Sequence, residues 1–204
     1  MAQRIKSMLH KILSSHKIIL ASQSPRRREI FELLKLDYEV KSSDIAEPMT
    51  DEDPALQVMR HARNKARAVS DNELNPDLIV AADTVVVCEA RILGKPETKA
   101  EAADFLSILS NREHTVITGV SLIGKGGSLT CYEQTQVWFA SLRDSEIEEY
   151  ISTSEPMDKA GAYGIQGYGS QFITRVEGCF FNVMGFPIRR FYEMVLELDK
   201  AGKL

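Results

Sequence analysis

Three arginines in a row follow a serine and a proline in the segment Ser22–Arg28. Ser24 suits the N-cap of a helix and Pro25 its first position, so a helix start accounts for these two residues. It does not account for the arginines, because each cation in a first turn opposes the helix dipole at a cost of about 0.3–1 kcal/mol. A bound phosphate reverses this sign, since free backbone N–H groups and guanidinium groups both donate to phosphate oxygens. The segment therefore predicts a phosphate-binding turn, with a solvated basic turn as the alternative.

A single carboxylate interrupts the most apolar stretch of the sequence. Asp83, followed by Thr84, lies inside Leu78–Cys88, which is otherwise rich in valine and alanine. Burying a carboxylate without a partner is costly, so Asp83 must be hydrogen-bonded, paired with a cation or bound to a metal. Asp83 is therefore a candidate catalytic residue, and the alternative is an aspartate that only ties down a neighbouring loop.

Two lysines are candidates for contacts with phosphate. Lys95 precedes Pro96, which favours an extended backbone, so its ammonium group could reach across a cleft as a point charge. Lys65 lies in the basic segment Arg60–Arg67, where three arginines share one helix face and Lys65 points elsewhere. We interpret the arginine face as solvated.

The segment Asp158–Gly169 is rich in glycine, which allows the backbone to approach a ligand closely. Within it, Gln166 could both donate to and accept from the edge of a nucleotide base. A flexible surface loop is the alternative. Other hydrolase signatures are missing from the sequence, because it contains neither HExxH nor GxSxG, and the phosphate-loop-like Gly119–Gly126 lacks the final serine or threonine.

The composition limits the class of protein. The chain has 204 residues, of which 44% are hydrophobic, so it can bury a full core. Its net charge of −4 argues against a stable complex with nucleic acid, and phosphate recognition has to come from local basic clusters. Three cysteines without a CxxC pair suit a reducing compartment, and no apolar run approaches the roughly 20 residues of a membrane span. We expect a cytoplasmic protein that makes no contact with a membrane.

The candidate residues lie on or between alternating predicted strands and helices. Residues 1–17 form an N-terminal extension with an amphipathic pattern, and 18–204 form a single domain. We expect seven strands, over Lys17–Ala21, Tyr38–Lys41, Leu78–Cys88, Thr115–Ile123, Leu129–Phe139, Phe172–Val176 and Phe180–Val183. Five helices are expected, beginning at Pro25, Asp53, Lys99, Arg143 and Pro187. This alternation predicts an α/β fold with a mixed central sheet flanked by helices.

Four segments, taken together and in order, resemble the Maf family of nucleotide pyrophosphatases: Leu20–Arg27, Ala81–Val85, Gly94–Pro96 and Glu155–Gly169. The resemblance implies two lobes around a deep cleft, a Maf or ITPase-like arrangement that often forms homodimers. It also implies an enzyme that hydrolyses a nucleoside triphosphate between its α- and β-phosphates with Mg²⁺ or Mn²⁺.

The same resemblance implies roles for single residues. Asp83 matches the catalytic aspartate and a metal ligand, and Glu47 matches an acidic residue near the metal. Whether Asp83 acts as a base or as a ligand stays open. The positions that contact phosphate in the family are matched by Arg27, Lys65 and Lys95.

Specificity is also implied by the resemblance. The positions that separate a dTTP/UTP branch from a 7-methyl-GTP branch are matched by Arg26, Thr84 and Gln166. The segment around Gln166 is similar to the pyrimidine branch, so we expect hydrolysis of dTTP and UTP to the monophosphate and pyrophosphate. The alternatives are a 7-methyl-GTP pyrophosphatase and a non-catalytic nucleotide-binding regulator of cell division.

Overall fold

The fold is built on one mixed sheet of seven strands in the computed structural model, which describes residues 7–204 except 43–44, 47, 49, 51 and 74–75. The order across the sheet is β2-β1-β3-β5-β6-β7, and β4 pairs with β3. The strands β1, β2 and β3 run parallel and the other pairs are antiparallel. The strands are β1 (Ile18–Leu20), β2 (Tyr38–Val40), β3 (Leu78–Cys88), β4 (Arg91–Leu93), β5 (Glu113–Gly124), β6 (Gly127–Phe139) and β7 (Ile173–Glu177).

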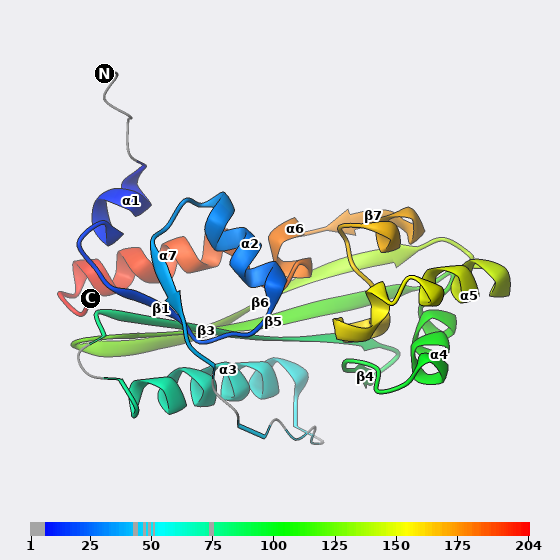
Figure 1. The fold of residues 1–204 in the computed structure, drawn as a ribbon, viewed down its shortest axis with the longest axis horizontal. Helices are drawn as coiled ribbons and strands as arrows, with labels where there is room; N and C mark the ends of the chain where they lie inside the picture. The colour runs from blue at the N-terminus through cyan, green and yellow to red at the C-terminus, as the bar shows by residue number, and fades with distance from the viewer. Residues whose placement is uncertain (1–6, 43–44, 47, 49, 51, 74–75) are drawn as a thin grey trace.

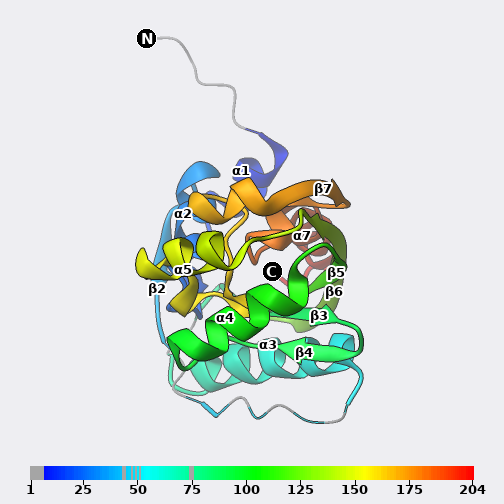
Figure 2. The ribbon, with the colours of Figure 1, turned by 90° about the vertical axis from the view of Figure 1, so that its right-hand side faces the viewer.

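Helices cover both faces of this sheet, as Figures 1 and 2 show. One face carries α3, the other carries α1, α2 and α7, and α4 and α5 lie at the far end of the long strands. The helices are α1 (Met8–Leu13), α2 (Pro25–Leu33), α3 (Pro54–Ser70), α4 (Lys99–Leu109), α5 (Asp144–Ser152), α6 (Phe180–Val183) and α7 (Ile188–Lys200). Three short 3₁₀ turns complete the chain: η1 (Glu155–Asp158), η2 (Ala160–Ala162) and η3 (Tyr168–Phe172). The expected α/β class with a mixed sheet flanked by helices is confirmed.

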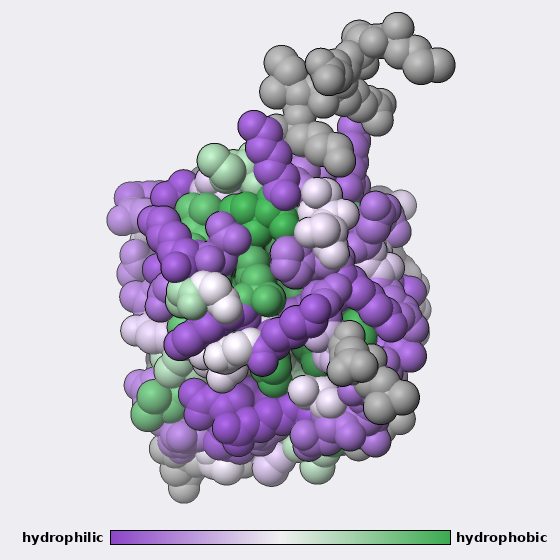
Figure 3. Space-filling model, turned by 90° about the vertical axis from the view of Figure 1, so that its left-hand side faces the viewer, coloured by the Kyte–Doolittle hydropathy of each residue, from purple (hydrophilic) through white to green (hydrophobic). Residues whose placement is uncertain are grey.

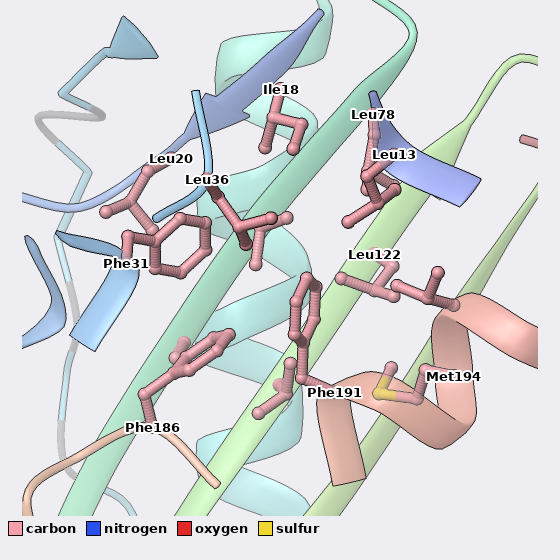
Figure 4. Packing of buried hydrophobic residues seen from close by; sticks show 14 of the residues in the cluster. Leu13, Ile18, Leu20, Phe31, Leu36, Leu78, Leu122, Phe186, Phe191 and Met194 are labelled. Atoms are coloured by element: carbon pink, nitrogen blue, oxygen red, sulfur yellow. The ribbon is translucent and has the colours of Figure 1, made fainter. Parts of the chain in front are cut away.

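The largest hydrophobic cluster joins the sheet to α2 and α7, and Figure 4 shows its packing. The rings of Phe31, Phe186 and Phe191 meet in pairs at centroid distances of 5.2 to 5.9 Å. Leu20 and Leu78 from the adjacent strands belong to the same cluster. Aromatic pairs at this spacing add to the burial of their apolar area. The cluster therefore fixes α2, which carries the arginines, against the sheet.

The N-terminal end of the described chain is helical, as the amphipathic pattern predicts. Leu9 and Leu13 of α1 are buried, and α1 lies against α7. Figure 3 views this end of the molecule, where hydrophobic residues show between hydrophilic ones. In the part of the chain that the structure describes, no helix combines the length and the apolar character needed to cross a membrane.

One predicted strand is wrong. Phe180–Val183 forms the short helix α6, although its two phenylalanines and valine suit a strand. The difference comes from Asn182, whose side-chain amide donates to the Val116 carbonyl and to the Thr135 hydroxyl at 3.0 Å each. The NH2 group of its buried amide thus has two tertiary partners. The strand β4 was not predicted.

The strand β3 has a gap in its pairing on one edge. Leu78–Val80 pair with β1 and Val86–Cys88 pair with β4, while β5 occupies the opposite edge. Between these two pairings, Ala81–Val85 have no strand beside them on the β1 side among the described residues. The gap contains Asp83, so the sheet opens where the buried carboxylate lies.

Gly119 allows α3 to approach the sheet closely at this gap. It lies opposite Asp83 in the β3–β5 register. A Cβ atom at Gly119 would lie 2.4 Å from the carbonyl oxygen of Val58 in α3, far inside van der Waals contact. The absence of a side chain at this position therefore brings α3 down to the level of Asp83.

We predict that Gly119→Ala destabilises the protein by roughly 1–3 kcal/mol, because the methyl group must push the α3 backbone away from the sheet. Urea unfolding measures this change. Gly94→Ala is the matched control, since a Cβ there meets nothing within 4 Å, and we expect a change of about 0.5 kcal/mol or less. Equal stability of the two variants would contradict the close packing of α3.

Candidate active site

A cleft of about 670 Å³ opens along the unpaired edge of β3. It is bounded by the loop between β1 and α2, by α3, by the segment after β4, and by the glycine-rich segment that was predicted to face a nucleotide. Seven of the predicted site residues line it: Arg26, Arg27, Lys65, Asp83, Thr84, Lys95 and Gln166. The eighth, Glu47, lies outside the described residues.

Asp83 is held by two donors from α3. The Lys65 ammonium lies 2.8 Å from one carboxylate oxygen, and Nδ1 of His61 lies 3.1 Å from the other. Because an ionised carboxylate only accepts hydrogen bonds, Nδ1 of His61 carries a proton. Burial raises the pKa of Asp83, but the His61 hydrogen bond and the Lys65 charge outweigh it and hold the pKa well below its usual value. Asp83 is therefore ionised despite being only 8% exposed.

His61 was not predicted as a site residue, although a signal was present. His61 and Lys65 are four residues apart, and this spacing places both on the same face of α3. The arginines of α3 face elsewhere, as predicted: Arg63 is exposed and Arg60 pairs with Glu52 at 2.9 Å. The sheet-facing side of α3 thus carries the partners of Asp83, and the arginine side is solvated.

Arg27 is fixed by three acceptors. Its Nε donates to the Gly185 carbonyl at 2.8 Å, and its two terminal nitrogens donate to Ser22 at 3.1 Å and Thr84 at 3.0 Å. Arg27 is 8% exposed and lines the cleft. A guanidinium group held at three points loses little further conformational freedom when it donates hydrogen bonds to phosphate oxygens.

The turn that carries Arg27 differs from the prediction in one detail. Ser24 occupies the N-cap position of α2, but its side chain makes no capping hydrogen bond. The Ser22 hydroxyl instead accepts from the backbone N–H of Ser24 and from Arg27. Ser22 begins the predicted phosphate-binding segment Ser22–Arg28, but its contact with Arg27 was not predicted. Of the three arginines, Arg28 is exposed and does not line the cleft.

Arg26 joins the two walls of the cleft. It donates to the carboxylate of Asp158 at 2.9 Å and to the carbonyl of the same residue at 3.1 Å, 132 residues away. Lys159 donates to the other oxygen of that carboxylate at 2.6 Å. Burial raises the pKa of Asp158, and the hydrogen bond from Lys159 with the charge of Arg26 lowers it further than burial raises it. Asp158 is therefore a second acid of the cleft that holds two cations.

The glycine-rich segment is built into the fold rather than loose on the surface. Glu155 accepts from the Tyr150 hydroxyl at 2.9 Å and from the backbone N–H groups of Tyr168 and Gly169. Gly161, at φ +69°, packs on β3, because a Cβ there would lie 2.9 Å from Val86. These contacts hold the segment across the cleft and argue against a flexible loop.

A buried pair lies beneath the same segment. The hydroxyl of Tyr163, which lines the cleft, lies 2.7 Å from Nε2 of His114. Burial lowers the pKa of His114 to about 4, so its ring is neutral at neutral pH. The neutral imidazole of His114 therefore holds Tyr163 of the glycine-rich segment by a hydrogen bond without placing a charge beside the cleft.

A metal ion would find few protein ligands in this cleft. No three histidine, cysteine, aspartate or glutamate side chains come together as a metal-binding group among the residues described. Asp83 and Asp158 are the described carboxylates that line the cleft, and both are held by cations. Beyond these two acids, the described lining of the cleft offers a metal no further carboxylate.

The mixed sheet and a cleft lined by five cations around two acids define an α/β protein whose cleft suits an anionic ligand. The comparison with protein families is more specific, because the model of the family described as "Maf-like protein" matches residues 17–198. The chain belongs to the Maf family.

Relatives with assigned activities are similar over most of their length. The chain is 44% identical over 184 residues to a dTTP/UTP pyrophosphatase of Bacillus mycoides (strain KBAB4), covering 90% of this chain and 96% of that protein. It is 46% identical over 175 residues to the dTTP/UTP pyrophosphatase of Bacillus anthracis, covering 85% and 91%. Among solved structures, a HAM1 protein from Coxiella burnetii aligns over 78% of this chain and 80% of its own, with 19% identity and a TM-score of 0.45.

Proposed function

We propose that this protein hydrolyses nucleoside triphosphates, dTTP and UTP above all, to the monophosphate and pyrophosphate. One observation carries the proposal: Arg27 of α2 and Lys65 of α3 reach the same cleft from opposite faces of the sheet, on either side of the ionised Asp83. The names of the Bacillus relatives support the nucleotide class. We propose further that it acts in the cytoplasm, a reducing compartment that suits its free cysteines, and that it forms a homodimer, as the family resemblance implies.

The charge of the cleft suits a polyphosphate. Its described lining holds five lysines and arginines, namely Arg26, Arg27, Lys65, Lys95 and Lys159, and two acids, Asp83 and Asp158. The whole chain has a net charge of −4, so this local excess of cations runs against the overall charge. A positively lined cleft with low-dielectric walls concentrates anions. A triphosphate is the anion that we propose for it.

The residues of the cleft are compatible with a bound Mg²⁺ or Mn²⁺. Each oxygen of Asp83 accepts one hydrogen bond and keeps a lone pair for a metal. Mg²⁺ is commonly held by one or two carboxylates, with phosphate oxygens and water completing its shell, so a small set of protein ligands suffices. We propose Asp83 and Glu47 as the two carboxylates. The bound metal would neutralise charge on the triphosphate.

The protein side chains supply positioning and charge. Phosphoryl transfer needs little covalent chemistry from the protein, and catalysis comes mainly from placing the reactants and stabilising charge. In the proposed reaction, Arg27, Lys65 and Lys95 bind phosphate oxygens and stabilise the charge that develops as the α–β bond breaks. Asp83, kept ionised by its partners, orients the attacking water by accepting its hydrogen bond.

Specificity is proposed for three further side chains that line the cleft. Gln166 is exposed and lines the cleft from the glycine-rich segment, where its amide can meet the edge of a base. Arg26 is held by Asp158, and Thr84 by Arg27. We propose that these three side chains distinguish dTTP and UTP from other nucleotides.

We predict that Asp83→Asn lowers the release of pyrophosphate from dTTP with Mg²⁺ by about 10²–10⁴-fold, because the neutral amide accepts water and metal less well. A coupled pyrophosphate assay measures the rate. Asp104→Asn is the matched control, since Asp104 is an exposed aspartate on α4 outside the cleft lining, and it should keep the wild-type rate. A folded Asp83→Asn protein with an unchanged rate would remove the proposed role.

For the wild-type protein, we predict faster release of pyrophosphate from dTTP and UTP than from CTP, ATP or 7-methyl-GTP. Gln166→Ala should reduce this preference by about tenfold while changing the rate on the best substrate less, because a lost base contact affects discrimination. The kcat/KM values across the five nucleotides test both statements. A uniform loss on every substrate would contradict base recognition by Gln166, and nucleotide binding without any release would favour a non-catalytic regulator.

A further inference from the structure

A buried chain of hydrogen bonds starts at Arg27 and runs into the sheet. Arg27 donates to the Thr84 hydroxyl at 3.0 Å, and this hydroxyl lies 3.0 Å from that of Thr118, its partner in the β3–β5 register. The Thr118 hydroxyl donates to the backbone carbonyl of Asn182 at 3.1 Å. Thr118 and Asn182 have no exposed surface and do not line the cleft. They cannot touch a substrate, and the mechanism proposed above does not use them.

The acceptors in this chain fix the direction of its protons. A carbonyl oxygen only accepts, so the single proton of the Thr118 hydroxyl points to Asn182. The Thr84 hydroxyl then donates to Thr118. Its own oxygen is left as the acceptor for Arg27, whose guanidinium only donates. Every group of the chain is satisfied in this order.

Apart from Ser22, Arg27 has two acceptors, the Thr84 hydroxyl and the Gly185 carbonyl. Both are connected by hydrogen bonds to the backbone carbonyl of Asn182. The Asn182 carbonyl also accepts from the backbone N–H of Gly185 at 2.9 Å, and the Gly185 carbonyl accepts from Nε of Arg27. Asn182 is itself immobilised, because its side-chain amide donates to Val116 and Thr135. The carbonyl of Asn182 thus holds Arg27 by two routes, one through Thr118 and Thr84 and one through Gly185.

We propose that Thr118 and Asn182 are positioning residues, which set the orientation of the Arg27 guanidinium by fixing Thr84 as a hydrogen-bond acceptor. The inference rests on the proposed function, in which Arg27 binds the triphosphate. Without the Thr118 hydroxyl, the proton of Thr84 loses its acceptor and can turn towards Arg27, where two donors would face each other. Arg27 would then lose one of its three anchors and bind phosphate less well.

Thr118→Val and Thr118→Ser test this inference as a pair. Valine keeps the shape of the side chain and removes the hydroxyl, while serine keeps the hydroxyl and removes the methyl group. We expect Thr118→Val to raise the KM for dTTP by about 5–20-fold with a smaller change in kcat, because the phosphate contact is made in both the ground and the transition state. Thr118→Ser should stay within about twofold of wild type.

Control variants and measurements of the fold separate positioning from a general effect on packing. Ser121→Ala removes a buried hydroxyl from the same strand, where its partner is Thr130 and not a cleft residue, and it should leave KM unchanged. Thermal unfolding and circular dichroism verify the fold, and Thr118→Ala serves as a second variant if the valine does not fold. The double variant Thr84→Val/Thr118→Val should be no worse than Thr84→Val alone, because both break one chain.

Binding of inorganic tripolyphosphate, measured by calorimetry, distinguishes this inference from the proposed function, because it needs no hydrolysis. We expect Thr118→Val to weaken binding by a factor similar to its effect on KM, and Thr118→Ser to preserve it. Folded Thr118→Val with wild-type affinity, or an equal loss in the valine and serine variants, would overturn the inference. An inactive wild-type protein whose affinity still responds to Thr118→Val would instead overturn the proposed function alone.

Discussion

A carboxylate buried in the middle of a sheet sets the main constraint on this fold. Asp83 has apolar neighbours along β3, and a buried charge without partners would cost several kcal/mol, a large part of the roughly 5–15 kcal/mol by which proteins are stable. The cost is met by the donors His61 and Lys65, which α3 brings within 3.1 Å. Their approach depends on Gly119, the one position opposite Asp83 where a side chain would block the helix.

The gap in the pairing of β3 turns this constraint into a site. Successive side chains of a strand point to opposite faces, so Asp83 meets α3 on one face and Thr84 meets Arg27 of α2 on the other. At a paired edge the two faces would be separated by the neighbouring strand. At the open edge between β1 and β4, cations from both faces line one cleft. The proposed polyphosphate would bind across the edge of the strand, which explains why the site needs residues that are far apart in sequence.

Local sequence signals predicted much of this arrangement. The bounds of β3 and α4 agree with the predictions, because apolar runs and helical periodicity report burial directly. The resemblance to the Maf family selected seven described residues that share one cleft, and no pattern in a single segment would have grouped them. Their catalytic and binding roles stay predictions.

The sequence failed where a residue's role depends on a distant partner. The segment predicted as a strand at Phe180–Val183 is a helix, from which Asn182 donates its side-chain NH2 group to β5 and β6. His61 and Thr118 resemble ordinary buried polar residues until the register of β3 with β5 and the packing of α3 are known. Ser24 makes no capping hydrogen bond, and the Ser22 hydroxyl accepts from the Ser24 N–H and from Arg27. Each of these contacts is set by tertiary structure, to which local propensity gives no access.

The central claim is that one triphosphate is held from both faces of the sheet at the open edge of β3. A crystal structure with an α,β-imido analogue of dTTP, which cannot be cleaved at the proposed bond, tests it most directly. We predict phosphate oxygens within hydrogen-bonding distance of both Arg27 and Lys65, next to Asp83. A triphosphate that contacts only one of these cations, or that binds outside the cleft, would contradict the claim.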